Sequence, residues 1–283
     1  YFMLTNSEKL RKGSQGAAQT VISKEMINML PISLPHLPEQ QRIVAILDEA
    51  YGGIATAKAN AEKNLKNARE IFDSYLQSVF DTKNQKCELV RLADLATDIT
   101  DGDHLPPPKA VSGIPFITIS NINKNTCKID FTDTFKVPKE YYQKIKSHRR
   151  PQNGDVLYTV TGSYGIPVII DFDLEFCFQR HIGLIRPKSE VDSKWLYYLL
   201  LSPSFMSQAN EQATGTAQKT VSLQSLRKFT VPKIPLQVQL SMVARLDALS
   251  AETQRLESIY QRKIAALDEL KQSLLQRAFA GEL

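Results

Sequence analysis

Several loops in the middle of the chain carry side chains that suit contact with nucleic acid. One loop, from Ile99 to Lys109, contains three consecutive prolines together with a histidine and a lysine. Another, from Thr159 to Gly165, combines hydroxyls and a tyrosine with two glycines that allow close backbone approach. Arg, Asn and Gln read base edges, whereas Lys, Ser and Thr position phosphates. The number of such loops in one region favours DNA binding over an ordinary set of polar loops. The candidate DNA-binding residues are His104, Lys109, Ser120, Asn121, Lys124, Arg149, Arg150, Thr161, Ser163, Tyr164, Gln179 and Arg180.

These candidates are expected to divide between base contacts and phosphate contacts. The side chains of Gln179 and Arg180 suit bidentate hydrogen bonds to bases. Tyr164, with Gly162 and Gly165 close by, suits approach to a groove or stacking on a base. A lysine carries charge with little geometric information. Phosphate contacts are therefore expected from the basic residues Lys109, Lys124 and Arg150.

Motifs for catalysis or cofactor binding are absent from the sequence. It contains neither G-x-G-x-x-G nor G-x-x-x-x-G-K-[ST], and it has no Asn-Pro-Pro-aromatic segment of a DNA amino-methyltransferase. Asp81 to Lys83 and Asp192 to Lys194 faintly resemble the acid-x-lysine of nucleases, but both lie in polar linkers without the upstream Pro-Asp. The four histidines have no metal-ligand spacing. No catalytic residue, cofactor or metal is predicted.

Composition narrows the class of protein. A chain of 283 residues can form one or two domains, and its formal net charge of +5 permits nucleic-acid binding without requiring it. Cys87, Cys127 and Cys177 lack C-x-x-C spacing, so reduced thiols of a cytoplasmic protein are expected. The sequence has no apolar run long enough to span a bilayer and no signal-peptide pattern, so no membrane association is expected.

The elements that must position the loops are organised by an internal repeat. Residues 16–80 and 215–279 follow one pattern at a constant offset (215 − 16 and 279 − 80 both give 199). Residues 44–48, for example, are VAILD, and residues 243–247 are VARLD. Two copies of one unit therefore flank a long segment that is not repeated.

Each copy of the repeat ends in a predicted long helix. Apolar residues recur at spacings of three and four from Leu37 to Phe80 and from Met242 to Leu274. A helix of ~40 residues is roughly 60 Å long, which exceeds the diameter of a small domain. We expect the two helices to bury their apolar stripes on each other in antiparallel directions; the alternative is two ordinary amphipathic helices in separate cores. A bend or fray is expected at Gly52-Gly53.

Between the helices lies a segment of short strands and turns. If Thr118 to Lys124 forms a strand, its hydroxyl and amide side chains share one face. Two helices are expected at Ser193 to Leu201 and Ser204 to Ala213, separated by Pro203. Other strands are expected over runs rich in β-branched residues: Val90 to Leu92, Ile114 to Ile119, Asp155 to Val160, Val168 to Ile170 and Ile182 to Ile185.

The sequence therefore predicts an α+β fold. A mixed, mostly β domain with a few helices is flanked by two long helices that form an antiparallel coiled coil. The expected boundaries are 36–82 for the first long helix, 83–235 for the mixed domain and 236–283 for the second long helix. Residues 1–35 are expected to be the end of an earlier domain in a longer protein, because the chain lacks an initiator methionine and Tyr1 to Ser7 corresponds loosely to Tyr198 to Ser204. A native short form is the alternative.

These residues give the chain a family resemblance. It resembles the specificity subunit of type I restriction–modification enzymes at Leu37 to Asp48 (LPEQQRIVAILD) and Leu270 to Leu283 (LKQSLLQRAFAGEL). The mixed domain resembles it at DGDH (101–104), GIPFI (113–117), GDVL (154–157), GSYG (162–165) and QRH (179–181). The chain departs from the family in having one complete recognition domain instead of two, and in PLQVQ at 235–239, where the first copy has LPEQQ.

The resemblance implies a DNA-recognition subunit without catalytic activity. In that family each target-recognition domain reads half of a split double-stranded DNA target, and the helix pair fixes the spacing between the halves. Methyltransferase subunits, which bind S-adenosylmethionine, dock on the helices, and restriction subunits cleave unmethylated DNA. For this chain the resemblance implies one recognition domain at 83–235, the remnant of another at 1–35, the same partners, and no cofactor of its own.

Three alternatives stay open at this point. In the first, the chain is a half-length subunit that dimerises to complete recognition. In the second, it is a coiled-coil scaffold whose domain binds a protein. The scaffold would lack salt-dependent DNA binding. A free-standing nuclease is disfavoured by the missing motifs.

Overall fold

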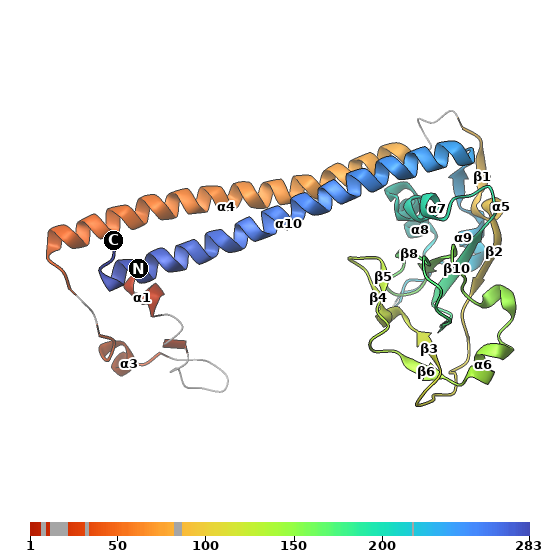
Figure 1. Ribbon diagram of the computed structural model, residues 1–283, viewed down its shortest axis with the longest axis horizontal. Helices are drawn as coiled ribbons and strands as arrows, with labels where there is room; N and C mark the ends of the chain where they lie inside the picture. Colours follow the sequence, from red (N-terminus) through yellow and green to blue (C-terminus); the bar gives the residue numbers. More distant parts are fainter. Residues whose placement is uncertain (7–9, 12–21, 32–33, 82–86, 217) are drawn as a thin grey trace. The chain divides into compact units, whose positions relative to one another are not determined.

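Two long helices contribute to both compact units of this protein. The computed structural model describes residues 1–6, 10–11, 22–31, 34–81, 87–216 and 218–283. One unit is formed by Tyr1–Glu70 with Glu252–Leu283, and the other by Ile71–Ala251. Figure 1 shows the long helices α4 (Leu37–Phe80) and α10 (Leu236–Ala280) in orange and blue. The first unit also contains the short helices α1 (Phe2–Thr5) and α3 (Lys24–Asn28).

In the first unit, α4 and α10 pack against each other in antiparallel directions (Figure 1). Ion pairs join Lys58 to Asp268 at 2.7 Å and Arg69 to Glu257 at 3.0 Å, so residue numbers rise along α4 as they fall along α10. This arrangement confirms the predicted antiparallel coiled coil. It gives each apolar stripe a partner, as the length of the helices requires.

The pattern of buried residues on α4 explains this pairing. A seven-residue repeat keeps one face of a helix turned toward its partner along a coiled coil. The helix continues through Gly52 and Gly53, so the expected fray there is wrong. Packing along the flanking turns outweighs the penalty of about 1 kcal/mol per glycine. The residues buried at every seventh position are Leu47, Ile54, Ala61 and Ala68.

The repeat in the sequence is also a repeat in local structure. Ser23 caps α3 by accepting a hydrogen bond from the backbone N–H of Met26 at 3.3 Å. Ser222 occupies the matching position (222 − 23 = 199) and accepts from the backbone N–H of Ser225 at 3.0 Å. It thereby caps α9 (Leu223–Lys228).

A four-stranded antiparallel sheet lies at the centre of the second unit. Its strand order is β2-β10-β7-β8, so β10 pairs with both β2 and β7. Smaller sheets have the orders β6-β3-β9, β4-β5 and β1-β11, and β3 pairs with β9 in parallel. The strands are β1 (Leu89–Arg91), β2 (Ala96–Asp101), β3 (Ile114–Ile117), β4 (Ile122–Asn123), β5 (Lys128–Ile129), β6 (Phe135–Val137), β7 (Val156–Thr159), β8 (Pro167–Ile169), β9 (Cys177–Phe178), β10 (Ile182–Pro187) and β11 (Thr230–Pro232).

The main core of the second unit joins this sheet to helices. The ring of Trp195 lies 5.9 Å from that of Phe80 near the end of α4, and both residues are fully buried. Tyr158 of β7 packs edge-on against Phe205 at 5.6 Å. The remaining helices are α5 (Leu92–Leu95), α6 (Lys139–Lys144), α7 (Ser193–Leu201), α8 (Pro203–Gln212) and the 3-10 turns η1 (Ile119–Asn121) and η2 (Ser147–Arg149).

Most predicted elements of this unit have a counterpart, with one clear correction. Thr118 to Lys124 is not a single strand, because η1 interrupts it before β4 begins. The backbone N–H of Thr118 donates to the side-chain oxygen of Asn121 at 2.9 Å, which stabilises the turn instead of an extended chain. The predictions also omit the strands β2, β5, β6, β9 and β11. Pro203 opens α8, where its missing N–H is tolerated.

None of the helices in the described ranges is both long and apolar enough to cross a membrane.

Candidate nucleic-acid interface

An open pocket of about 420 Å³ forms where three strands of the central sheet end. The register pairs Gly183 with Asp101 of β2, and Ile182 with Thr159 of β7. The last residues of β2 and β7 therefore lie beside the first residues of β10, at the same end of the sheet. The pocket gathers three of the predicted DNA-binding residues, His104, Thr161 and Arg180, together with Asp101, His181, Gln218 and Thr220.

The turn that carries Arg180 is held by backbone hydrogen bonds. The N–H of Arg180 donates to the carbonyl oxygen of Asp103 at 3.0 Å, and the N–H of Gln179 donates to that of Ile117 at 3.0 Å. The Arg180 side chain is exposed, and its guanidinium makes no hydrogen bond or ion pair with any residue that the structure describes. A fixed backbone with an uncommitted guanidinium suits bidentate recognition of a base or a phosphate.

Close packing fixes the neighbouring loop against the same turn. The backbone of Gly102 lies so near β9 that a Cβ there would come within 1.9 Å of the carbonyl oxygen of Phe178. The N–H of Asp103 donates to this same oxygen at 2.8 Å. The loop that carries His104 therefore needs glycine at position 102.

His104 and Arg149 converge on one carboxylate. His104 Nε2 lies 2.9 Å from Asp101 Oδ2, and Arg149 Nη2 lies 3.1 Å from Asp101 Oδ1. Arg149 also donates to the carbonyl oxygens of Asp101, at 2.8 Å from its Nε, and of Gly102. The structure thus places Arg149 where it holds the backbone of the His104 loop.

Arg150 and Asn121 are likewise engaged within the chain. Arg150 Nε donates to the carbonyl oxygen of Ile145 at 2.9 Å, and its guanidinium lies 5.0 Å from the ring centre of Tyr142. Asn121 is buried, and its side-chain oxygen also accepts a hydrogen bond from the hydroxyl of Thr118 at 2.9 Å. These contacts explain both side chains without a ligand.

The other candidates lie outside the pocket. Lys109 is exposed with its Nζ 5.3 Å from the ring centre of Phe135, and Lys124 is exposed. Ser120 is exposed, and its hydroxyl lies 2.7 Å from that of Thr118. Ser163 is exposed beside Tyr164, whose hydroxyl donates to Asn210 of α8 at 2.8 Å. Gln179 precedes Arg180 on the same turn and is half-buried.

Asp101 and Thr220 were not among the predicted site residues. Thr220 pairs with Thr161 through an isolated β-bridge, and their hydroxyl oxygens lie 3.3 Å apart. This bridge brings the segment after α8 to the pocket. Only the three-dimensional pairing of Thr161 with Thr220 could have revealed that Thr220 belongs to the pocket, because the two threonines are far apart in the sequence.

The sequence segment that contains Asp101, His104 and Arg149 carries an excess of positive charge. Residues 101–150 contain nine Lys and Arg against five Asp and Glu (9 − 5 = +4), which accounts for most of the formal net charge of +5. Partial burial, and then the positive charge of Arg180, lower the pKa of His181 below its ordinary value. Among the described residues, no group of three or more His, Cys, Asp and Glu side chains is placed to hold a metal ion. This chemistry suits a polyanion.

Comparisons with known proteins place the whole chain in one family. A family model described as "Type I restriction modification DNA specificity domain" matches residues 1–67 and 84–264. The EcoBI specificity subunit of Escherichia coli is 28% identical over 172 residues, which cover 60% of this chain and 36% of that protein. The MjaVIII specificity subunit of Methanocaldococcus jannaschii is 22% identical over 305 residues, covering 100% of this chain and 69% of that protein.

Solved structures show the same fold. A chain from a type I R-M system has a TM-score of 0.78 at 22% identity, over 98% of this chain and 68% of that one. The HsdS subunit from Thermoanaerobacter tengcongensis has a TM-score of 0.65 at 22% identity, over 99% of this chain and 68% of that one. The protein therefore spans about a third of the EcoBI subunit and about two thirds of these other relatives.

Proposed function

Because this chain belongs to the type I restriction modification DNA specificity family, we propose that it recognises a DNA sequence for such a system and is not itself a catalyst. Its relatives are named as specificity subunits of type I restriction enzymes. The sequence also lacks the motifs that would bind a nucleotide or methyl-donor cofactor.

The observation that carries the proposal is the uncommitted guanidinium of Arg180 on a fixed turn. This guanidinium lies in an open pocket with His104 and Thr161, and residues 101–150, which include His104, carry an excess of positive charge. Arginine is the side chain that most often specifies guanine in the major groove. We assign Arg180 to base readout, and Lys109 and Lys124 to phosphate contacts because both ammonium groups are exposed.

Three of the predicted candidates receive a supporting role in this proposal. The side chains of Arg149, Arg150 and Asn121 make hydrogen bonds to other residues of the domain. They position the loops that meet DNA and do not themselves read bases. Ser120, Ser163, Tyr164 and Gln179 remain proposed contacts at the edge of the surface.

The finer architecture is also proposed. The recognition domain at 83–235 reads one half of a split double-stranded target, and the helix pair sets the spacing to the other half. Methyltransferase subunits dock on the helices, and restriction subunits join the complex. Residues 1–35 are the end of a first recognition domain, and the complex works in the cytoplasm. A rigid helical spacer supports this division, since at 1.5 Å per residue it converts protein length into base-pair separation.

A selection experiment tests the proposed function. The purified chain is incubated with a library of random duplexes at two salt concentrations, and the bound DNA is sequenced. We expect enrichment of one short motif, with binding that weakens as salt rises. A library recovered without enrichment, or no salt-dependent binding at all, would favour the coiled-coil scaffold that binds a protein. Methylome sequencing of the source cell with and without the gene would reveal the complete split motif.

A half-length subunit that dimerises is the alternative within the same family. It predicts that the selected motif is an inverted repeat, because two identical domains related by a two-fold axis bind identical half-sites. A single unrepeated half-site would exclude it for the purified chain.

A further inference from the structure

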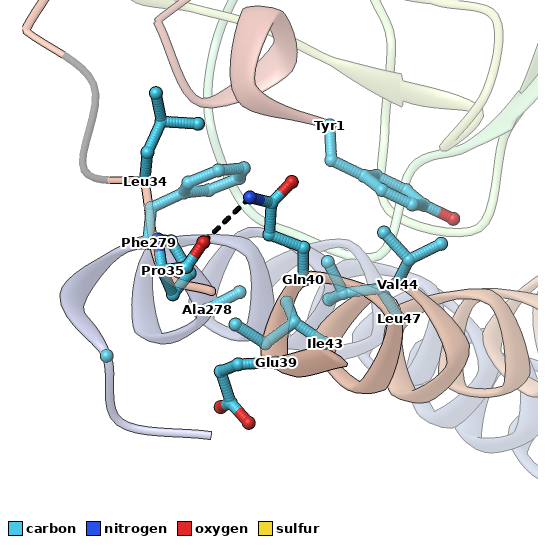
Figure 2. Close-up of a pocket in the computed structure, with 11 residues that line it drawn as sticks. Tyr1, Leu34, Pro35, Glu39, Gln40, Ile43, Val44, Leu47, Ala278 and Phe279 are labelled. Atoms are coloured by element: carbon cyan, nitrogen blue, oxygen red, sulfur yellow. Dashed lines mark hydrogen bonds between the residues drawn. The ribbon is translucent and has the colours of Figure 1, made fainter. Parts of the chain in front are cut away.

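Some residues recur at the same place in both copies of the repeat, which indicates a task that both copies share. Gln40 and Gln239 form one such pair (239 − 40 = 199). Gln40 Nε2 donates to the carbonyl oxygen of Pro35 at 2.7 Å, the bond drawn in Figure 2, and Gln239 Nε2 donates to that of Ile234 at 2.6 Å. For this pair the shared task lies inside the chain, where each glutamine holds the backbone that leads into a long helix.

Ahead of the long helices the two copies share few residues. Gly215 has a φ of 104°, and a Cβ there would come within 2.4 Å of the carbonyl oxygen of Gln218, so the turn needs glycine. Ser222 caps α9, as Ser23 caps α3. These two residues therefore recur for structural reasons. Ala217 and residues 16–19 lie outside the described part of the chain. Over residues 215–235, the positions that match the first copy in residue type are Gly215, Ala217, Gln218 and Ser222.

Gln218 recurs without a task inside the domain. Its side chain is exposed, and its amide group makes no hydrogen bond with any residue that the structure describes. Its backbone is nevertheless fixed. The N–H groups of Thr214 and Thr220 each donate to the carbonyl oxygen of the other, at 3.0 and 2.8 Å, and the N–H of Gly162 donates to that of Lys219 at 3.0 Å. The turn thus holds an unused amide at the open pocket that Gln218 lines together with Arg180.

The side chains that line this pocket suit an anion. Asp101 is the one carboxylate among the lining residues, and its two oxygens are engaged by His104 at 2.9 Å and by Arg149 at 3.1 Å. The guanidinium of Arg180 has no such partner among the described residues. The amide of Gln218 adds two N–H donors beside it. A hydrogen bond from such a donor to a charged oxygen is roughly twice as strong as one between neutral groups.

We propose that Gln218 donates a hydrogen bond to a phosphate of the DNA backbone and so positions the duplex over the pocket, independently of the base that Arg180 reads. This assignment rests on the proposed function, in which each recognition domain reads its own half of a split target. A side chain present in both domains then contacts what two different half-sites have in common. That common part is the sugar–phosphate backbone.

The recurring chemistry at this turn is a neutral amide. At the next position the copies differ, because Lys219 corresponds to Thr20 (219 − 20 = 199), so a cation does not recur there. Glutamine also suits bidentate bonds to adenine, but a base reader would be expected to differ between domains that read different sequences. A neutral contact and a base contact predict different results when Gln218 is removed.

Binding titrations of Gln218→Ala, on the selected and the scrambled duplex at several salt concentrations, test the assignment. We expect the Kd to rise about tenfold on both duplexes, because the lost bond is to a charged group. The log–log salt slope should stay unchanged, since a neutral side chain displaces no counterion. Gln224→Ala is the matched control and should bind as the parent chain does. Gln224 is an exposed glutamine of α9 outside this pocket, and its counterpart in the first copy is the acidic Glu25.

Selected duplexes with a single methylphosphonate locate the contact. At the contacted phosphate, Gln218→Ala should cause no further loss of affinity, because the bond is already absent. A loss confined to the selected duplex would make Gln218 a base reader, and a drop in unfolding free energy would make it structural; either result overturns the proposal. A parent chain that binds no DNA overturns the proposed function as well. A parent chain that prefers the selected duplex, with a Gln218→Ala variant of equal affinity, overturns this assignment alone.

Discussion

The hydroxyl of Tyr198 on α7 donates a 2.6 Å hydrogen bond to Asp247 on α10, within the second unit. Lys194, one turn earlier on α7, places its Nζ 2.7 Å from the other carboxylate oxygen of Asp247. One carboxylate of α10 thus binds two side chains of α7.

Replacing Tyr198 by phenylalanine removes this bond while keeping the ring. We expect the free energy of unfolding to fall by about 1–2 kcal/mol, because the acceptor is charged and the tyrosine is almost completely buried. Tyr75→Phe is the matched control, since Tyr75 packs on the same core and its hydroxyl has no hydrogen bond to any residue that the structure describes. Urea unfolding measures both, and equal losses would show that the contact with Asp247 contributes nothing.

The ion pair between Arg186 and Asp155 should contribute far more than exposed pairs do. Asp155 is 2% exposed and accepts from Arg186 Nε at 2.8 Å and Nη2 at 2.7 Å. Arg186→Ala leaves a buried carboxylate without its cation, so we expect a loss of about 3–5 kcal/mol.

Lys233→Ala provides the control for this ion pair. Lys233 and Glu88 lie 3.2 Å apart with side chains 58% and 66% exposed. Its removal should change the unfolding free energy by no more than about 1 kcal/mol. Similar losses in the two variants, measured by thermal or urea unfolding, would contradict the importance assigned to burial.

Arg149 is predicted to support the interface from behind. Arg149→Ala removes the hydrogen bonds to Asp101 and Gly102, so we expect a loss of about 1–3 kcal/mol in stability. Binding should weaken to a similar extent on every duplex, because the His104 loop loses its anchor. Lys146→Ala, in the same basic cluster but exposed, should leave stability within about 0.5 kcal/mol of the parent chain. A stable Arg149 variant that changes sequence preference alone would reassign Arg149 to base readout.

His181 should make both stability and binding depend on pH. Its folded-state pKa is lowered, so the unfolded chain takes up the proton first as pH falls through about 6.5. The contribution of His181 to folding stability is therefore complete above this pH and declines below it. Protonation of His181 also adds a positive charge to the folded chain, which strengthens DNA binding. His181→Asn should remove both effects. Unfolding and binding measured at pH 5.5 and 7.5 check this, and an unchanged pH dependence in the variant would assign it to other groups.

The long helices were the most predictable part of the fold. The bounds Leu37–Phe80 follow from apolar spacing and from the length that forces a partner. The turn at η1 was not predictable, since the alternation of polar and apolar residues fits a strand equally well. The hydrogen bond from the backbone N–H of Thr118 to the side chain of Asn121 favours the turn. Local hydrogen bonding decided that case.

The candidate site was predictable by residue type but not by role. His104, Thr161 and Arg180 stand out in the sequence, yet only the pairing of β10 with β2 and β7 brings them together. Arg149 and Arg180 are the same side chain in equally polar loops. One is used inside the domain and the other is free to bind, and no sequence pattern separates the two.

Binding titrations of Arg180→Ala test the central claim most directly. They use the duplex recovered by selection and a scrambled duplex of equal composition, each at several salt concentrations. We predict a loss of about 1–3 kcal/mol on the selected duplex and much less on the scrambled one, with unfolding unchanged. Lys124→Ala, the control, should weaken both equally and reduce the log–log salt slope by about one unit. An Arg180→Ala chain that keeps its full preference for the selected duplex would contradict the assignment of this pocket to base readout.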